Sequence, residues 1–276
     1  MPELPEVETV TKEMAQKLVN KRIQSVHVRR YDLRWPIPKN FEQAMQGALI
    51  KNITRRAKYI LIETDTENGM LWHLGMSGRV KISEQPSKPP IYEKHDHVQL
   101  ILQDGTWIRY FDPRRFGTIQ LVNNHDFIKN ALLGHLGCEP LSLDFKGQLI
   151  KAAVANKKAP IKNLIMDQRL VVGVGNIYAC EALFDAKINP NCPGHEITKS
   201  KADTLCLSIK KVLANAIKAG GSTLKDYRKS DGSLGYFQYQ FNVYDQAGQG
   251  CKKCAAKIVR ITQAGRSTFY CPKCQK

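Results

Sequence analysis

Four cysteines near the C-terminal end constrain the fold more than any other feature of the sequence. They form two close pairs, Cys251-x-x-Cys254 and Cys271-x-x-Cys274, with 16 residues between the pairs. This spacing suits four thiolates arranged tetrahedrally around one zinc ion. The intervening residues alternate in polarity and predict a β-hairpin that turns near Gly265-Arg266. Because four thiolates leave no position for water, we expect a structural zinc.

Two disulfides are the alternative for these cysteines. The other four, Cys138, Cys180, Cys192 and Cys206, are scattered singly. Such scatter is typical of reduced thiols in a cytosol. The chain opens without a cleavable leader, and no apolar run approaches the roughly 18 residues of a membrane-spanning helix. We therefore expect a zinc site in a cytoplasmic protein without a membrane partner.

The charge of the chain points to a polyanionic partner. Its 276 residues hold 42 Lys and Arg against 25 Asp and Glu, a formal charge of +17. Nucleic acid is the simplest partner for such a surplus, and its binding weakens steeply with salt. An anionic membrane surface is the competing interpretation.

The first half of the chain predicts an antiparallel β-sandwich. Its apolar, β-branched stretches are Ile23–Val28, Leu49–Glu63 and Met70–Ile82, followed by a hairpin over His97–Phe111 that folds at Asp104-Gly105. Several adjacent strands of this kind form a sandwich or barrel. We place this domain at residues 1–133 and assign no chemistry to the proline-rich stretch at about 82–94.

Past residue 130 the pattern becomes helical. A long amphipathic helix is predicted over Ser200–Ala219, ending at Gly220-Gly221. Earlier, Gly173 and Gly175 precede Asn176 between two helical runs, where backbone amides can approach a phosphate. A simple tight turn is the alternative, and the third glycine of a dinucleotide fingerprint is missing. We assign residues 134–225 to a helical domain, 226–241 to a loop end and linker, and 242–276 to the zinc hairpin.

The first residues can supply a catalyst from the chain terminus itself. After removal of Met1, Pro2 carries a secondary amine that can attack a sugar carbon and form an iminium ion. Apolar residues recur three and four apart from Leu4 to about Asn20 and predict an amphipathic helix. Glu3 then lies beside the nucleophile as a proton donor, near the positive end of the helix. A proline after the initiator and acids in a first turn are also common without any catalysis.

Several motifs in order resemble bacterial formamidopyrimidine-DNA glycosylase. They are Pro2-Glu3-Leu4-Pro5-Glu6, Lys58, Asp112-Pro113-Arg114-Arg115-Phe116-Gly117, Gly173-Val174-Gly175-Asn176-Ile177-Tyr178 and the four paired cysteines. The resemblance runs from residue 2 to residue 276. It implies a multidomain α+β protein with an N-terminal helix and β-sandwich, a helix-two-turn-helix domain and a zinc-finger hairpin. It also implies a monomeric DNA glycosylase and AP lyase that releases oxidised purines from double-stranded DNA.

The resemblance also implies a role for individual residues. Pro2, Glu3, Lys58 and Arg266 are expected to be catalytic, with Glu6 supporting them. His95, Arg114, Lys157 and Asn176 are expected to contact DNA. Met76, Arg114 and Phe116 are expected to fill the space left by an everted nucleotide, and Thr223, Lys225 and Tyr236 belong to the loop that covers it. On local grounds alone, Lys58 also fits a solvated strand end, and Met76 and Phe116 also fit a core.

Three other functions remain open at this point. Endonuclease VIII shares the superfamily but prefers oxidised pyrimidines, and it usually has glycine where this chain has Leu4. A non-enzymatic zinc-ribbon DNA-binding protein explains the charge and the cysteines but not Pro2, Glu3 and Lys58. A general RNA-binding factor explains the charge alone.

Overall fold

The computed structural model describes residues 2–83, 91–124, 126–222 and 240–276. These residues form two compact units. The first contains the chain up to residue 134 together with residues 220–222, and the second contains residues 135–219 together with residues 240–276. Each unit is described by itself.

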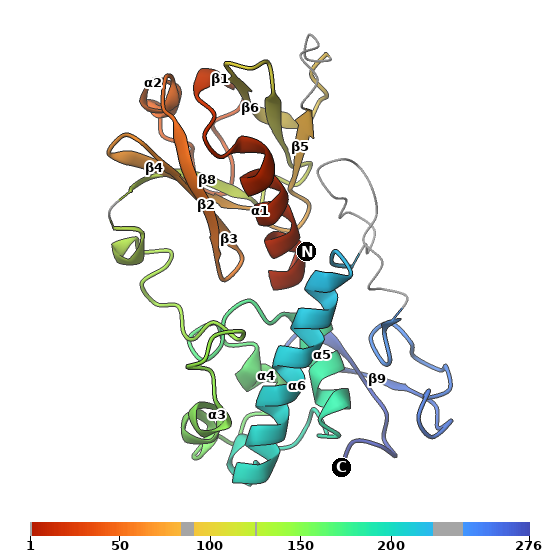
Figure 1. Ribbon diagram of the computed structural model, residues 1–276. Coiled ribbons are helices and arrows are strands. Elements are labelled where there is room, and N and C mark those ends of the chain that lie inside the picture. Colours follow the sequence, from red (N-terminus) through yellow and green to blue (C-terminus); the bar gives the residue numbers. More distant parts are fainter. Residues whose placement is uncertain (1, 84–90, 125, 223–239) are drawn as a thin grey trace. The chain divides into compact units, whose positions relative to one another are not determined.

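The first unit is built from two antiparallel sheets and a long N-terminal helix (Figure 1). One sheet has the strand order β1-β6-β7-β5 and the other has the order β2-β3-β4-β8. The strands are β1 (Ile23–Val28), β2 (Ile50–Arg56), β3 (Tyr59–Thr64), β4 (Asn68–His73), β5 (Arg79–Ser83), β6 (Asp96–Leu102), β7 (Trp107–Phe111) and β8 (Thr118–Asn123). The helices are α1 (Leu4–Leu18), the short α2 (Phe41–Met45) and the 3-10 turn η1 (Phe127–Lys129).

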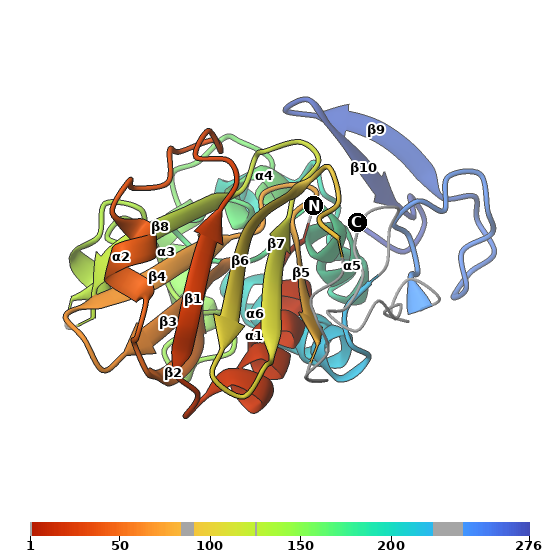
Figure 2. The ribbon, with the colours of Figure 1, turned by 90° about the horizontal axis from the view of Figure 1, so that it is seen from above.

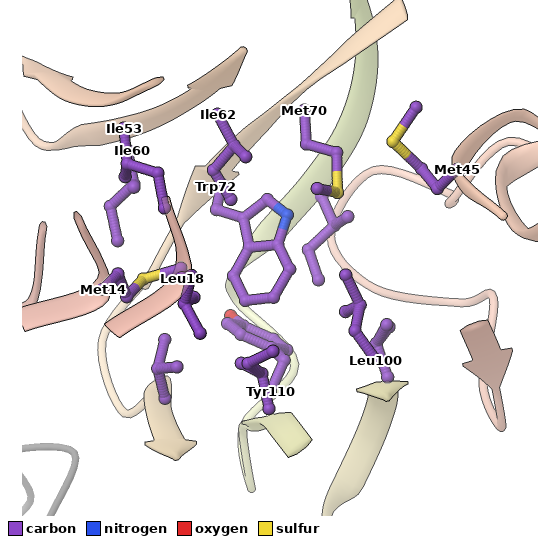
Figure 3. Close-up of a cluster of buried hydrophobic side chains, with 14 of the residues drawn as sticks. Met14, Leu18, Met45, Ile53, Ile60, Ile62, Met70, Trp72, Leu100 and Tyr110 are labelled. Carbon is purple, nitrogen blue, oxygen red and sulfur yellow. The ribbon is translucent and has the colours of Figure 1, made fainter. Parts of the chain in front are cut away.

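The two sheets lie one behind the other with α1 alongside them (Figure 2). Side chains from both sheets and from α1 contribute to one hydrophobic core (Figure 3). Met14 and Leu18 of α1 belong to this core together with Ile60 from one sheet and Leu100 from the other (Figure 3). Trp72 lies at the centre, fully buried, with its ring 5.7 Å from that of Tyr110 in an edge-to-face arrangement. A sandwich with the N-terminal helix packed against it is therefore confirmed.

The second unit is helical and ends in a two-stranded hairpin. Its helices are α3 (Gly147–Val154), α4 (Ile161–Ile165), α5 (Asn176–Asp185) and α6 (Lys199–Lys218), with the 3-10 turn η2 (Gly194–Glu196) between the last two. The hairpin pairs β9 (Val259–Gln263) with β10 (Arg266–Tyr270). Its turn at Ala264-Gly265 agrees with the predicted turn near Gly265-Arg266.

Two predicted strand regions each contain two strands. The stretch Leu49–Glu63 is divided by a turn at Ala57-Lys58, where Ala57 has a φ of +54°. Arg55 and Arg56 therefore belong to the end of β2. The stretch Met70–Ile82 is interrupted by a loop at residues 74–78. Both interruptions carry residues singled out for chemistry.

Not one helix within the described segments combines the length and the apolar character that crossing a bilayer requires.

Substituting Trp72 tests the shared core. Trp72→Ala is expected to lower the free energy of unfolding by about 3–5 kcal/mol, because removal of the indole ring leaves a cavity that the two sheets cannot close. Trp35→Ala is the matched control, since Trp35 is 51% exposed. Urea denaturation followed by circular dichroism measures both variants. Equal losses for Trp72→Ala and Trp35→Ala would contradict a single core around Trp72.

Candidate active site and DNA interface

Helix α1 holds the N-terminal residues in a buried position. Pro2 is buried, and Glu3 and Glu6 are 3% and 2% exposed. Glu3 is the N-cap residue, and its backbone N–H donates to Oε2 of Glu6 over 2.8 Å in a capping box. The first turn of α1 therefore fixes the backbone directly after Pro2.

The other oxygen of Glu6 binds a distant part of the chain. Oε1 accepts hydrogen bonds from the backbone N–H of Ser222 at 2.8 Å and from its hydroxyl at 3.0 Å. Gly221, with a φ of +79°, lies against Glu6, where an added Cβ would come within 3.1 Å of the carboxylate. One carboxylate thus joins the N-terminus to residues 221–222.

The turn that carries Lys58 is tied to the same helix. Nε of Arg55 lies 2.6 Å from Oε2 of Glu8 on α1, and Nη1 of Arg55 donates to the carbonyl oxygen of Ala57 at 2.8 Å. Arg55 is largely buried, so this ion pair is protected from solvent. The turn that carries the half-buried Lys58 is consequently held beside α1.

His73 is a site residue that the sequence analysis missed. It ends β4, and its Nδ1 accepts the backbone N–H of Gly75 at 3.1 Å, which leaves the proton on Nε2. Burial is the largest cause that lowers the pKa of His73, and with the charges of Lys58 and Arg34 it brings this pKa to about 4. His73 is therefore neutral near pH 7 and lies close to Lys58. A histidine directly before a glycine-flanked loop was the available signal.

Met76, Arg114 and Phe116 line one open pocket of about 670 Å³. Met76 and Phe116 are 36% and 41% exposed, and the guanidinium of Arg114 lies 4.8 Å from the centre of the Phe116 ring. Large exposed apolar side chains beside an arginine fit insertion into a duplex better than a place in a core. The structure therefore brings together the three residues proposed to fill the space of an everted nucleotide.

The two loops that carry these residues are fixed from beneath by Asp112. Its fully buried carboxylate accepts from the Ser77 hydroxyl at 2.7 Å and from the Gly117 N–H at 2.8 Å. A Cβ on Gly117 would lie 1.5 Å from the Tyr110 hydroxyl, and a Cβ on Gly75 would lie 2.4 Å from the Phe116 backbone. The glycines let the loops pack this closely, so the side chains above them have little freedom.

The remaining predicted DNA contacts occupy different positions. His95 is half-buried, with its ring 5.7 Å from that of Phe111. Lys157 is exposed in the second unit. Thr223, Lys225 and Tyr236 lie outside the described residues.

Asn176 and Arg266 are brought close together in the second unit. Nδ2 of Asn176, at the start of α5, donates to the carbonyl oxygen of Ser267 at 2.8 Å, next to the exposed Arg266. Oδ1 of Asn176 accepts from Nζ of the buried Lys162, which also contacts Thr268 at 2.6 Å. The Asn176 side chain thus joins α5 to β10.

The four paired cysteines fit a tetrahedral metal site. Their sulfur atoms lie within 4.8 Å of one another, with distances of 3.9 Å for Cys251–Cys274 and 3.5 Å for Cys254–Cys271. Zinc–sulfur bonds of about 2.3 Å place tetrahedral sulfurs about 3.8 Å apart. The backbone N–H groups of Lys253 and Cys274 point at sulfur atoms at 3.4 Å, which stabilises thiolates. The donor set therefore fits one structural zinc.

This metal centre packs directly onto α5. Cys251 and Cys271 share a hydrophobic cluster with Cys180 and Phe184 of that helix. Glu181, another buried residue that the sequence analysis missed, accepts the backbone N–H groups of residues 242, 243 and 244 at 2.9–3.0 Å. An acid inside the apolar run of α5 was the signal for this anchor.

Family comparisons cover most of the chain. The Formamidopyrimidine-DNA glycosylase N-terminal domain matches residues 1–119, and the Formamidopyrimidine-DNA glycosylase H2TH domain matches residues 136–228. The zinc finger found in FPG and IleRS matches residues 248–276. The architecture is thus that of a zinc-finger protein with a helix-two-turn-helix domain.

Full-length relatives agree with these matches. The chain is 47% identical to the formamidopyrimidine-DNA glycosylases of Phenylobacterium zucineum and Rhizorhabdus wittichii, with complete coverage of both chains. A Lactococcus lactis FPG mutant solved with DNA containing Fapy-dG superposes with a TM-score of 0.91 at 34% identity and full coverage. MutM in complex with DNA containing carbocyclic 8-oxo-G gives 0.89 at 34% identity, also with full coverage. The chain belongs to the formamidopyrimidine-DNA glycosylase family.

Glu6→Gln tests the link between the N-terminus and Ser222. The glutamine amide has only one oxygen, so it cannot accept from both the Glu3 N–H and the Ser222 N–H. One of these buried N–H groups therefore loses its acceptor, at a cost of about 1–3 kcal/mol. We expect base release to slow on the order of tenfold. Glu13→Gln, on the same helix outside this contact, is the control. Single-turnover kinetics on duplex with 8-oxoguanine measures the rates, and equal rates for both variants would rule out this role.

Zinc removal tests the C-terminal centre. Chelation is expected to unfold residues 242–276 and abolish DNA binding while the first unit stays folded. In a small structural zinc site, the free energy of metal binding supplies most of the stability of the fold. Hydrogen exchange read by mass spectrometry locates the loss, and fluorescence anisotropy measures DNA affinity. Cys192→Ser, outside the cluster, should behave like the unaltered protein. Unchanged affinity after confirmed zinc loss would refute the role of the centre.

Proposed function

We propose that the protein is a bifunctional DNA glycosylase and AP lyase of base excision repair that removes oxidised purines. The observation that carries this proposal is the buried N-terminal turn, in which Glu6 fixes the backbone next to Pro2 beside the Lys58 turn. Formamidopyrimidines and 8-oxoguanine are the proposed substrates. Relatives solved with Fapy-dG, 8-oxo-G and abasic DNA support this substrate class.

The proposed chemistry begins at the Pro2 nitrogen. Its lone pair attacks C1′ of the everted nucleotide, and the bond between C1′ and the base breaks with its electrons on the base. The Pro2 nitrogen passes its N–H proton to the departing base. Glu3 protonates the sugar ring oxygen, so the ring opens and the nitrogen lone pair converts the C1′–N bond into an iminium ion. Glu6 keeps Glu3 and Pro2 in place.

Strand cleavage follows from the iminium ion. The cation accepts electrons from C2′, so a C2′ proton is lost and the 3′ phosphate leaves by β-elimination. A second, δ-elimination expels the 5′ phosphate and leaves a one-nucleotide gap. Lys58 and Arg266 stabilise or protonate the departing groups. These steps need only side chains and the chain terminus, and the zinc holds the hairpin that carries Arg266.

Eversion of the lesion requires a replacement in the duplex. We assign this role to Met76, Arg114 and Phe116, because they share one pocket on loops fixed by Asp112. His95, Arg114, Lys157 and Asn176 are assigned to the DNA backbone, and Thr223, Lys225 and Tyr236 to the loop over the everted base.

We further propose functional domains at residues 1–133, 134–225 and 242–276. Residues 226–241 link the second of these domains to the third. The proposed protein is a cytoplasmic monomer that binds the nucleoid through DNA.

Endonuclease VIII-like activity on oxidised pyrimidines is the second candidate. One observation favours testing it, since a Lactococcus lactis FPG relative was solved with DNA that contains an oxidised pyrimidine. Leu4 and the intact Met76, Arg114 and Phe116 set favour purines. Release from duplexes with 8-oxoguanine, formamidopyrimidine and thymine glycol distinguishes the two, and faster release of thymine glycol would favour the alternative.

Borohydride trapping tests the covalent mechanism. An iminium ion is reduced to a stable amine, so the unaltered protein should become attached to duplex with 8-oxoguanine. Pro2→Gly and a form that retains Met1 are expected to trap poorly, because the first alters the nucleophile and the second blocks it. Lys12→Ala, on the exposed side of α1, is the control. Gel mobility measures the adduct, and its absence in the processed protein would exclude this mechanism.

A further inference from the structure

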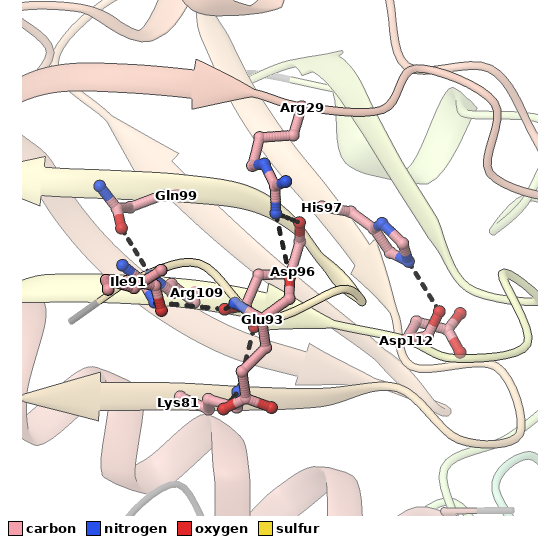
Figure 4. Close-up of polar contacts among 9 residues, drawn as sticks. All are labelled: Arg29, Lys81, Ile91, Glu93, Asp96, His97, Gln99, Arg109 and Asp112. Atoms are coloured by element: carbon pink, nitrogen blue, oxygen red, sulfur yellow. Dashed lines mark hydrogen bonds and ion pairs between the residues drawn. The ribbon is translucent and has the colours of Figure 1, made fainter. Parts of the chain in front are cut away.

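A charged network lies beneath the loop that precedes β6 (Figure 4). Asp96 and Arg109 are 1% and 2% exposed, and Nη1 of Arg109 lies 3.2 Å from Oδ2 of Asp96. Nε of Arg109 donates to Gln99 at 2.6 Å, and Nζ of Lys81 lies 3.1 Å from the other oxygen of Asp96. The carboxylate of Asp96 is therefore paired with Arg109 of β7 and with Lys81 of β5, and Lys81 also pairs with Glu93.

The same network holds the loop at residues 91–95 against the sheet. Nη1 of Arg109 donates to the carbonyl oxygen of Ile91 at 3.3 Å, and its guanidinium lies 4.4 Å from the centre of the Tyr92 ring. Glu93 donates its backbone N–H to Asp96 at 2.9 Å and pairs with Lys81 at 2.6 Å. The loop therefore has a fixed backbone despite its exposed side chains.

The loop holds the Arg29 side chain in place but supplies no carboxylate to balance its positive charge. Its Nη1 donates to the carbonyl oxygens of Glu93 at 3.0 Å and Asp96 at 3.2 Å, and its guanidinium lies 4.6 Å from the centre of the Tyr92 ring. Among the described residues no carboxylate pairs with Arg29. An exposed guanidinium held by carbonyl oxygens and an aromatic face is ready to bind an anion through its remaining N–H groups.

Other cations surround Arg29 in a polar pocket of about 540 Å³. Lys94 is exposed and makes no ion pair with any residue in the described ranges. Arg30 shares Asp32 with Arg115, so one carboxylate serves two guanidinium groups. The pocket is lined by Arg29, Arg30, Tyr31, Asp32, Lys94 and Asp96. Since Arg109 and Lys81 compensate Asp96, the pocket has a surplus of positive charge.

We propose that Arg29 and Lys94 bind a backbone phosphate of the DNA duplex outside the everted nucleotide. This inference rests on the proposed function, which supplies the duplex. A phosphodiester matches the site because it carries one negative charge and acceptor oxygens for a guanidinium and an ammonium group. The contact is independent of sequence and lesion, so it adds affinity and holds the first unit in register on the duplex.

Lys94→Ala and Arg29→Ala test the proposal by DNA affinity and its salt dependence. We expect the Kd for undamaged and lesion-containing duplexes to rise about fivefold for Lys94→Ala and about tenfold for Arg29→Ala. The slope of log Kd against log salt should fall by about 0.9 for each lost contact. Single-turnover excision at saturating enzyme should stay unchanged. Lys94 makes no described contact, so its removal does not loosen the loop.

Lys51→Ala is the matched control, because Lys51 is exposed on β2 outside the pocket. Equal changes in slope for Lys51→Ala and Lys94→Ala would overturn the proposal, as would an unchanged slope for Lys94→Ala. Excision of 8-oxoguanine by the unaltered protein in the same assays checks the proposed function separately. If the unaltered protein does not excise 8-oxoguanine but Lys94→Ala still lowers the salt slope, the proposed glycosylase activity is refuted and the phosphate contact is supported.

Neutral methylphosphonate linkages, placed one at a time in the duplex, locate the contact. One linkage is expected to weaken binding of the unaltered protein but not of Lys94→Ala, because the charge partner is already absent. Titration with inorganic phosphate, followed by NMR, tests whether the site binds free phosphate instead of a DNA phosphodiester. The assignment to DNA would be overturned if free phosphate bound in a Lys94-dependent way while no neutral linkage in the duplex weakened binding.

Discussion

The buried carboxylate of Glu6 is the interaction on which the arrangement of the N-terminus depends. One oxygen holds the Glu3 N–H directly after Pro2, and the other holds Ser222, which lies 216 residues further along the chain. A terminus is ordinarily the least ordered part of a protein. Here it begins a helix whose apolar side is part of the sandwich core, so the order of the core extends to the proposed nucleophile.

Buried acids have the same structural task elsewhere in the molecule. Asp112 fixes the loops that present Met76, Arg114 and Phe116, and Glu181 fixes the segment that leads into the zinc hairpin. In each case a carboxylate accepts several N–H or O–H donors and holds irregular backbone in one conformation. Met76, Arg114 and Phe116 are therefore exposed side chains on rigid supports, which limits the entropy lost on binding.

The sequence predicted those parts whose signals are local. The α1 periodicity, the Asp104-Gly105 hairpin and the paired cysteines each reside in a short stretch, and the structure agrees with all of them. The turn at Ala57-Lys58 was not located, because the β2–β3 register depends on pairing across the sheet. The contact between Glu6 and Ser222 depends on tertiary packing that no local pattern encodes. Family resemblance supplied residue roles but none of these distances.

The central claim is that the imino nitrogen of Pro2 becomes bonded to the deoxyribose of the damaged nucleotide. Tandem mass spectrometry of the reduced protein–DNA adduct, after digestion with protease and nuclease, tests it most directly. We expect one modified peptide, which begins at Pro2 and carries the reduced sugar on its terminal nitrogen. A sugar found on Lys58 or another lysine, or an active protein that still carries Met1, would contradict it.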